Sequence, residues 1–475
     1  MDDDSRPCPG CSARQREIDE LKKRVAELEK RLDDKERAGK RQAAPFAKGP
    51  PQEQPKKPGR KAGPKHGRHG HRPPPPEEAI DETLEAPLPE VCPDCGGEIQ
   101  EDDDVDEQFQ TDIPTRPIRR KIRIHKGCCK SCGRRIRGRH PLQTSDATGA
   151  AQSQLGPNAQ ASIVYLNKRC GLSYGKIADH LKEANGIDIQ PSTATRIVLR
   201  AADKLQPVYE EIKESIQNAT VITPDETGWR NGGRPVWLHA WVSDQATCYV
   251  IDPHRSADAL EQVIGLDYSG SLIHDGASTY DRFQEALHQQ CVAHPLRRAH
   301  SLEENLGGRD KLFPRQVSDL LQGALDIRDA YQQGELDRAD LEVAFEMHCA
   351  DLYRLTARPR RHPANETFAR HLHHHGPEWF LFLLAPEQPA TNYLAEQALR
   401  TPIVNRKVFG GNRTDAGCQA QVITASTIQT CRQQKRSAFA FLRDAVCGLV
   451  QSIFSAVLGK SPSRSEPLPL PIGVR

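Results

Sequence analysis

Around residue 20, apolar and charged residues alternate in a way that is typical of a two-faced helix. The apolar positions are spaced by three and four residues: Ile18, Leu21, Val25, Leu28 and Leu32. This spacing is the a/d seam of a coiled coil, although an amphipathic helix packed on its own chain gives the same pattern. Because the flanking residues are polar, we predict a self-associating coiled coil over residues 1–38, and hence a homo-oligomer.

A second set of apolar residues recurs with helical spacing between residues 155 and 217. The pattern predicts helices over Ala159–Lys168 and Tyr174–Glu183, a break at Asn185-Gly186, and a further helix that opens at Ser192. Two helices around a Gly-containing turn favour a helix-turn-helix with Ser192–Arg200 as its reading helix. A small helical bundle would give the same pattern.

From about residue 218 the apolar pattern changes from helical to extended. Four strands and one helix are predicted, with a hairpin turn at residues 231–233: strands at Val221–Thr223, Val236–Val242, Cys248–Ile251 and Ser271–His274, and a helix at Ser256–Ile264. This order predicts a mixed sheet with helices on its faces. We place this unit at residues 218–410, with a helical insertion at about 295–388, and expect a C-terminal helical region and tail over residues 411–475.

The length of 475 residues is too great for one ordinary core, so we expect an α+β multidomain protein. No apolar run approaches the roughly 20 residues needed to span a bilayer, and the first residues are acidic and polar. We therefore expect a cytoplasmic protein without a membrane partner. In that reducing compartment, paired cysteines more often bind zinc than form disulfides.

The net charge of +2 conceals two strongly basic blocks. Between Lys40 and Arg72 there are ten Lys or Arg residues and one acid, and between Ile113 and Ser145 there are eleven and no acid. The first block lies in a Pro/Gly-rich stretch, residues 39–90, which reads as an extended linker. The second lies within a cysteine-framed unit, so its charges are held where several phosphates can be contacted together. Both suit a polyanion such as DNA.

Cysteine pairs frame the second basic block. Cys92-x-x-Cys95 and Cys129-x-x-Cys132 supply four thiolates, which is the ligand set of a structural, tetrahedral Zn²⁺ site. We predict one zinc-binding domain over residues 91–145; Cys128 is a possible substitute for Cys129, and two independent pairs are the alternative. Cys8-x-x-Cys11 is a weaker pair, either a chance occurrence or a metal site between protomers.

Acidic residues lie at the ends of the predicted strands. Asp225 follows the first strand and Asp275 follows the fourth. Carboxylates gathered at a sheet edge can hold Mg²⁺, and two ions about 3.5 to 4 Å apart can promote phosphoryl transfer. Glu396, on a short helix after the helical interruption, is the best candidate for a third acid. Glu226 would point to the opposite face of a continued strand, so we leave it out of the site.

Four motifs together closely resemble the insertion sequence 66 family of DDE transposases. They are Pro224-Asp225-Glu226-Thr227-Gly228-Trp229; His274-Asp275-Gly276 with Tyr280; Gln290-Cys291-Val292-Ala293-His294 with Arg297-Arg298; and Thr391-Asn392-Tyr393-Leu394-Ala395-Glu396-Gln397-Ala398-Leu399-Arg400 with Arg406-Lys407. The resemblance covers nearly the whole chain after about residue 14. It implies an RNase H-like catalytic core with a helical insertion, in which Asp225, Asp275 and Glu396 are the metal-binding catalytic acids.

The resemblance implies a DNA transposase that uses Mg²⁺ or Mn²⁺ and is associated with the nucleoid. Water attacks the phosphodiester at the end of the element, and the freed 3′-hydroxyl then attacks target DNA by in-line transesterification. The DNA partners are the terminal inverted repeats and the target, and element-encoded accessory proteins are possible partners. Basic residues that would position phosphates, if they are not merely solvated, are Arg297, Arg298, Arg400, Arg406 and Lys407.

Several alternative interpretations remain at this stage. One is a non-catalytic, zinc-dependent DNA-binding protein or an inactive transposase remnant. Another is a nickase with a tyrosine nucleophile, for which His371 to His375 would be the metal tract, but a tract within helical sequence does not hold both imidazoles toward one ion. Cys291-x-x-His294 offers only two ligands and is expected to pack or orient the core rather than bind metal.

Overall fold

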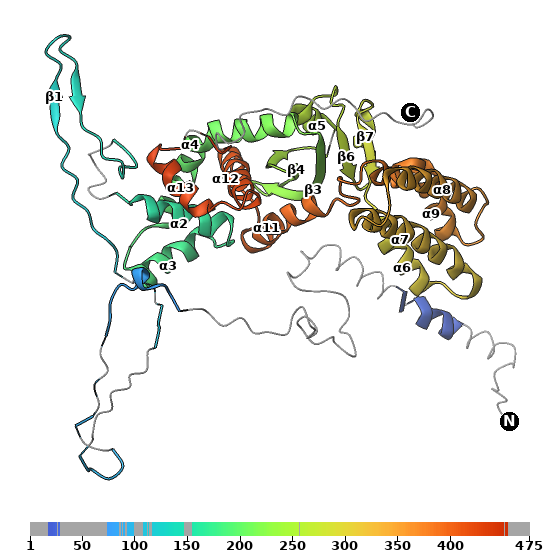
Figure 1. The fold of residues 1–475 in the computed structure, drawn as a ribbon, viewed down its shortest axis with the longest axis horizontal. Coiled ribbons are helices and arrows are strands. Elements are labelled where there is room, and N and C mark those ends of the chain that lie inside the picture. Colours follow the sequence, from blue (N-terminus) through green and yellow to red (C-terminus); the bar gives the residue numbers. More distant parts are fainter. Residues whose placement is uncertain are drawn as a thin grey trace, which may run out of the picture. The chain divides into compact units, whose positions relative to one another are not determined.

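The computed structural model (Figure 1) describes residues 18–25, 27–28, 74–84, 87, 89–90, 93–98, 108–111, 113, 116–146, 154–255, 257–450 and 452–454. The chain divides into two units, residues 1–114 and 115–475. Cys8, Cys11, Leu32, Cys92 and Ser256, together with most of the predicted linker, lie outside the described residues.

In the first unit, residues 18–25 and 27–28 are helical, as their apolar spacing predicts. The seam residues Ile18, Leu21, Val25 and Leu28 are 44 to 57% exposed. Within the described part of the chain nothing covers this seam, so self-association stays a prediction. A short 3₁₀ turn, η1 (Glu77–Ala79), lies within the predicted linker.

The second unit opens with a two-stranded hairpin. β1 (Lys126–Cys128) pairs antiparallel with β2 (Arg135–Arg137), and every residue of both strands is exposed. This hairpin is the cysteine-framed basic block of the sequence, and it presents its charges to solvent.

Three helices follow. They are α2 (Pro157–Lys168), α3 (Tyr174–Asn185) and α4 (Pro191–Gln217). α3 ends at Gly186, which adopts the left-handed conformation that glycine tolerates best. The predicted reading helix, Ser192–Arg200, is only the start of the 27-residue α4, whose apolar face is buried against other elements. A helix-turn-helix role therefore stays a prediction.

The sheet has five strands in the order β5-β4-β3-β6-β7. They are β3 (Val221–Asn231), β4 (Arg234–Val242), β5 (Thr247–Asp252), β6 (Ser271–His274) and β7 (Leu287–Gln290). β3, β4 and β5 are antiparallel neighbours, whereas β3, β6 and β7 are parallel neighbours. The mixed sheet is confirmed. β7 was not predicted, because its Leu-His-Gln-Gln sequence carries no apolar alternation.

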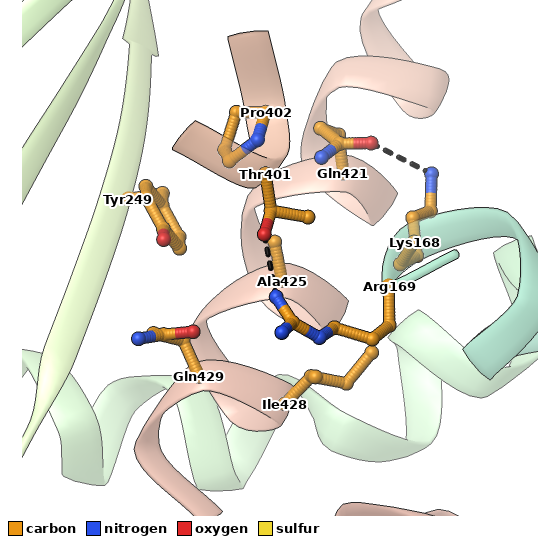
Figure 2. Close-up of a pocket in the computed structure, with 9 residues that line it drawn as sticks. All are labelled: Lys168, Arg169, Tyr249, Thr401, Pro402, Gln421, Ala425, Ile428 and Gln429. Atoms are coloured by element: carbon orange, nitrogen blue, oxygen red, sulfur yellow. Dashed lines mark hydrogen bonds between the residues drawn. The ribbon is translucent and has the colours of Figure 1, made fainter. Parts of the chain in front are cut away.

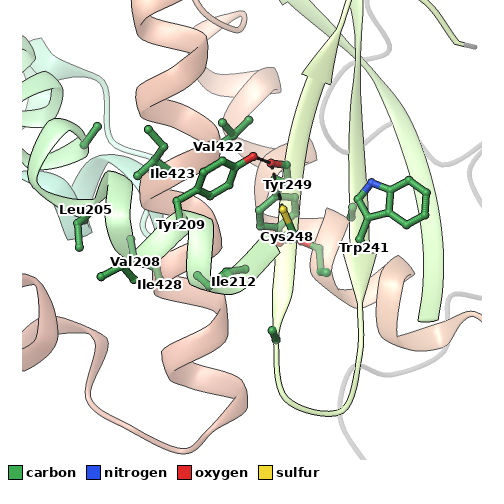
Figure 3. Close-up of a cluster of buried hydrophobic side chains, with 14 of the residues drawn as sticks. Leu205, Val208, Tyr209, Ile212, Trp241, Cys248, Tyr249, Val422, Ile423 and Ile428 are labelled. Carbon is green, nitrogen blue, oxygen red and sulfur yellow. Dashed lines mark hydrogen bonds between the residues drawn. The ribbon is translucent and has the colours of Figure 1, made fainter. Parts of the chain in front are cut away.

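Helices from distant parts of the sequence cover this sheet. α5 (Ala257–Ile264) packs on α4, α11 (Tyr393–Phe409) on β3 and β4, α12 (Asp415–Gln433) on α4 and β5, and α13 (Ala438–Cys447) on α2. One apolar core joins α2 to α4, the sheet and α11 to α13, with Tyr209, Trp241 and Ile423 in its centre (Figure 3). The helical region before the sheet therefore shares its core with the sheet.

The segment between β7 and α11 has an apolar core of its own. It contains α6 (Ala293–Asn305), α7 (Leu312–Gln332), α8 (Arg338–Thr356), α9 (Pro363–His375) and α10 (Leu381–Leu384). Its centre is formed by buried residues that include Phe345, Phe368, Leu372, Trp379 and Phe382. We call these helices the insertion. Among the described helices of the whole chain, none combines the length and apolar character that crossing a membrane requires.

Candidate active site

Asp225 lies in the middle of β3. The apolar pattern predicts a strand that stops at Thr223, but β3 continues because it pairs with β4 from Thr223 to Asn231. Asp225 pairs with Ala240 of β4, and Ala240 pairs with Tyr249 of β5. Residues directly opposite in antiparallel strands share a face, so these three side chains form one row on the sheet. The Asp225 Oδ1 accepts a hydrogen bond from the Glu226 N–H at 2.8 Å.

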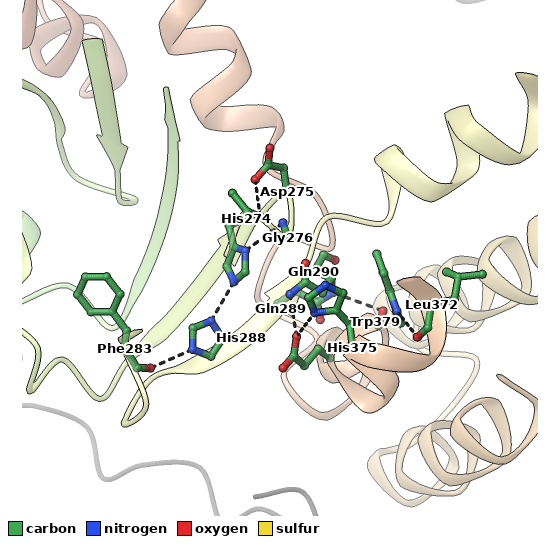
Figure 4. A network of polar contacts seen from close by, with 12 residues as sticks. His274, Asp275, Gly276, Phe283, His288, Gln289, Gln290, Leu372, His375 and Trp379 are labelled. Atoms are coloured by element: carbon green, nitrogen blue, oxygen red, sulfur yellow. Dashed lines mark hydrogen bonds and ion pairs between the residues drawn. The ribbon is translucent and has the colours of Figure 1, made fainter. Parts of the chain in front are cut away.

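Asp275 follows β6 directly, as predicted, and starts a tight turn. Its Oδ1 accepts a hydrogen bond from the Ala277 N–H at 3.1 Å. Gly276 has a φ of +84°, and a Cβ there would lie 2.8 Å from the Gln290 Oε1. Gln290 of β7 and the insertion both lie against this turn. His375 of the insertion belongs to the same polar network as Gln290, because both side chains contact Glu378 (Figure 4).

Buried histidines support the turn. The His274 Nδ1 accepts a hydrogen bond from the Gly276 N–H at 3.1 Å, and its Nε2 lies 2.9 Å from the His288 Nδ1. The His288 Nε2 lies 2.9 Å from the carbonyl oxygen of Phe283 (Figure 4). Burial lowers the pKa of His274 well below its usual value, so the His274 ring in this chain of contacts is neutral.

Glu396 is in the first turn of α11. Its Oε1 lies 2.9 Å from the Arg297 Nη2 of α6 and 4.0 Å from the His294 Nε2. The sequence predicts a helix around Tyr393–Leu399, but α11 continues to Phe409. It packs on β3 and β4, the two strands that carry Asp225 and its partner Ala240.

Two of the predicted acids, Asp275 and Glu396, act on the third, Asp225. Burial raises the pKa of Asp225 to about 7, and the negative charges of Glu226, Asp275 and Glu396 add to the increase. Among the described residues, no group of three or more His, Cys, Asp or Glu side chains is arranged to hold a metal ion. By their chemistry the acids nevertheless fit a divalent cation, because they are hard oxygen donors whose burial and mutual repulsion a cation would relieve.

Glu226 belongs to the other face of the sheet, as the alternation along β3 predicts. It pairs with His239, one position along from the row of Asp225. Its Oε1 lies 2.6 Å from the Arg255 Nη2, and its Oε2 accepts a hydrogen bond from the Tyr280 hydroxyl at 3.0 Å. Both oxygens are therefore engaged by the protein.

Two histidines lie beside the acids without having been assigned a role from the sequence. The charges of Asp275 and Glu396 act on the His294 side chain, whose Nδ1 is buried and has no partner among the described residues. Asp275 and Arg298 also act on His371 of α9, where burial lowers the pKa to about 4. His294 had a signal in the Cys291-x-x-His294 motif, and Cys291 indeed packs, accepting the Asn392 N–H at 3.3 Å on its Sγ. His371 had no signal beyond its histidine tract.

Comparison with protein families agrees with this architecture. A family model described as "Transposase IS66 family" matches residues 152–420, which include the sheet, the insertion, and all three acids. The chain belongs to the IS66 family of transposases. No curated protein matches the chain.

The basic residues predicted to position DNA have different surroundings in this family member. Arg297 is ion-paired with Glu396, and the Arg298 guanidinium lies 4.8 Å from the centre of the Phe368 ring. The Arg406 Nη1 lies 3.5 Å from the Thr227 Oγ1 of β3. The remaining two, Arg400 and Lys407, are exposed on α11.

The second cysteine of each predicted zinc-binding pair lies in a similar turn in this IS66 family member. Cys95 and Cys132 each end a turn, and each precedes a glycine with positive φ, Gly96 at +73° and Gly133 at +71°. Hydrogen bonds from the backbone N–H groups of Cys132 and Ser131 lower the pKa of Cys129. Because Cys92 lies outside the described residues and Cys95 belongs to the first unit, a four-thiolate zinc site stays a prediction.

Proposed function

We propose that this protein catalyses metal-dependent cleavage of DNA at the ends of a mobile element and joins those ends to target DNA. Asp225, Asp275 and Glu396 are the catalytic acids. The observation that carries the proposal is electrostatic: the carboxylates of Asp275, at the end of β6, and Glu396, on α11, both act on Asp225 of β3, although 171 positions separate Asp225 from Glu396. The mixed sheet with its helical insertion is compatible with an RNase H-like core.

The three carboxylates would hold Mg²⁺ or Mn²⁺. When bound, these ions lower the pKa of water, polarise the phosphoryl group and stabilise the leaving oxygen. In the first step the P–O3′ bond at the element end breaks and water supplies the new oxygen; in the second, the freed 3′-hydroxyl displaces a 3′-oxygen of target DNA. The protein supplies position: β3 and β6 fix two acids on adjacent strands, and α11 brings the third.

Arg297 and the other basic residues orient the DNA backbone. Arg297 is 58% exposed in its side chain while its guanidinium contacts Glu396, so it lies where a phosphate approaching the acids would meet it. Arg298, Arg400, Arg406 and Lys407 add positive charge on α6 and α11, the two helices that flank the acids. Such contacts set register on DNA without reading its sequence.

Zinc organises the basic hairpin. Cys92, Cys95, Cys129 and Cys132 would bind one structural Zn²⁺, supported by the matching turns at Cys95 and Cys132. Four thiolates leave no open position for a substrate, so this ion holds the fold rather than taking part in chemistry. The hairpin, the helical region 155–217 and the basic linker then bind the inverted repeats. Self-association through the N-terminal seam brings two ends together at the nucleoid, with or without accessory proteins.

The test is a strand-cleavage and joining assay on pre-nicked ends, using the inverted repeats that flank the gene. The full chain is compared with Asp275→Asn and Glu396→Gln in Mg²⁺ and in Mn²⁺. We expect metal-dependent products from the parent and at least about a 100-fold loss in either variant, because a missing ligand weakens metal binding. Glu303→Gln is the matched control, since Glu303 forms a similar surface ion pair, with Arg315 at 2.6 Å.

Equal activity in the parent and both variants would show that these acids are not catalytic. If all proteins bind the ends but none cleaves or joins, the non-catalytic DNA-binding interpretation is favoured. A covalent protein-DNA adduct would instead support a tyrosine nickase.

A further inference from the structure

α11 contains a proline, and this deletes one of its backbone hydrogen bonds. Pro402 has no N–H, and in an α-helix the N–H of residue 402 would be donated to the carbonyl oxygen of Ala398. Ala398 is buried and lies only two residues after Glu396. An unpaired buried carbonyl would be costly at this point of the helix.

Tyr249 of β5 supplies the hydrogen-bond donor that Pro402 lacks. Its hydroxyl donates a hydrogen bond to the Ala398 carbonyl oxygen at 2.7 Å. Tyr249 and Pro402 line the same small pocket, in which α2, β5, α11 and α12 meet (Figure 2). A side chain from the sheet therefore replaces the hydrogen bond that the helix cannot make for itself.

Burial and two hydrogen bonds of its backbone fix the position of Tyr249. The Tyr249 side chain is 2% exposed. Its backbone N–H donates to the Ser426 Oγ at 2.9 Å, and its carbonyl oxygen accepts from the Tyr209 hydroxyl at 2.8 Å (Figure 3). Tyr249 is thus anchored to α4 and α12 before it contacts α11.

The same residue belongs to the row that carries Asp225. Asp225, Ala240 and Tyr249 are direct cross-strand neighbours on β3, β4 and β5. α11 lies over β3 and β4, and the middle member of the row is a small, fully buried alanine. The row therefore links the first proposed catalytic acid to the helix that carries the third. Asp225 lies at one end of the row, and Tyr249, at the other end, donates a hydrogen bond to α11 two residues after Glu396.

Two further contacts fasten α11 at the C-terminal end of α2, one on each side of Pro402. The Nη1 of Arg169, the residue after α2, donates to the Thr401 Oγ1 at 2.5 Å, and the Asn405 Nδ2 donates to the Lys168 carbonyl oxygen at 2.7 Å. The Asn405 contact holds the C-terminal part of the helix to α2, whereas the Tyr249 bond acts on the turn that follows Glu396. Removing the Tyr249 hydrogen bond therefore leaves the Asn405 contact with α2 in place.

We propose that Tyr249 is a positioning residue for Glu396, because its hydroxyl satisfies the Ala398 carbonyl that Pro402 leaves unpaired and so holds the first turns of α11 in register with Asp225. The catalytic part of this inference rests on the proposed function. The hydrogen-bond part does not, since it concerns the rigidity of α11 alone.

The experiment is a cycle of four full-length proteins: parent, Tyr249→Phe, Pro402→Ala, and the double variant. Pro402→Ala returns an N–H that the Ala398 carbonyl can accept. We expect backbone amides of α11 to exchange hydrogen about tenfold faster in Tyr249→Phe, and the strand-joining rate to fall by a similar factor. In the double variant, both should return to within about threefold of the parent, because the helix supplies its own donor.

Tyr268→Phe is the matched control. The Tyr268 hydroxyl is also enclosed and donates to a backbone carbonyl, that of Ala219 at 3.0 Å, but it does not touch α11. It should leave exchange in α11 unchanged. Unchanged α11 exchange in Tyr249→Phe, or no rescue in the double variant, would overturn the inference, as would normal strand joining by Tyr249→Phe. If the parent joins no strands while exchange behaves as expected, the proposed function fails and the hydrogen bond is structural only.

Discussion

Lys168 is a lysine whose amine is enclosed by protein. Its Nζ donates to the Gln421 Oε1 at 2.9 Å (Figure 2), and burial lowers its pKa to about 7. In the unfolded chain the same group keeps its proton up to a pH of about 10.4. Between these two values the unfolded state binds more protons than the folded state, so stability rises with pH.

Lys168→Met should remove this pH dependence. The free energy of unfolding of the parent should rise by on the order of 4 kcal/mol between pH 7 and 10 relative to that of Lys168→Met, because the variant has no amine to deprotonate. The measurement is urea unfolding at several pH values. Lys176→Met, at an exposed lysine of α3, should follow the parent; parallel curves for parent and Lys168→Met would contradict the prediction.

Gly276→Ala should disturb the turn that presents Asp275. A methyl group at this position would lie 2.8 Å from the Gln290 Oε1. The Gln290 side chain cannot easily move away, because it is buried and its Nε2 donates to Glu378 at 2.7 Å. We expect a loss of roughly 2 to 3 kcal/mol in the free energy of unfolding and slower strand joining.

The control for this prediction is Gly334→Ala. Gly334 has a similar φ of +79°, but its Cβ would meet nothing within 4 Å. It should cost only about 1 kcal/mol, from backbone strain. Equal losses for the two variants would mean that the contact with Gln290 does not matter.

Sequence patterns predicted the places of some candidate residues in the sheet but not those of others. Asp275 follows β6 as predicted, and Glu226 lies on the other face because strand alternation is a local rule. Asp225 was expected after a strand and lies within one, since the length of β3 depends on pairing with β4. The neighbours of His294 and His371 come from distant segments, and no spacing along the chain could reveal them.

Among helices and strands, those with helical apolar spacing or a short apolar run were predicted best. α2, α3, β4 and β6 have the expected positions within a few residues. β7 was missed because Gln289 and Gln290 are buried through hydrogen bonds rather than apolar contacts. α11 extends beyond its predicted end although it contains Pro402, and Tyr249 satisfies the carbonyl that this proline leaves without a donor.

The insertion and the sheet should respond separately to a cavity. Leu352 is fully buried in the core of the insertion, and Leu205 is 1% exposed in the core around the sheet. Leu352→Ala and Leu205→Ala should each cost about 2 to 5 kcal/mol, because both leave a cavity. Hydrogen exchange should accelerate mainly in α7 to α9 for the first variant and mainly in α4 and α12 for the second. Identical exchange maps would show that the two cores unfold as one.

Across the full chain, assembly should depend on the N-terminal seam. Leu21→Asp places a charge on the exposed apolar row and should reduce the mass measured by sedimentation to that of a monomer, because a coiled coil does not tolerate a charge at its centre. Lys23→Asp introduces the same residue on the opposite side of the helix and should not change the mass. An unchanged mass for Leu21→Asp would assign self-association to another surface.

The order in which the ribosome synthesises the elements determines when α12 can cover β5. β5 packs against α12, and roughly 180 residues separate the ends of these two elements, a stretch that takes on the order of 10 to 40 seconds to translate. The last strand, β7, is made early in that interval and α11 late, so for much of it the nascent chain has all five strands but lacks α11 and the helix that covers β5. A ribosome-bound chain at this stage exposes the apolar surface of β5 and has no Glu396, and under the proposed function it gains all three acids only when nearly all of the folded region has been synthesised.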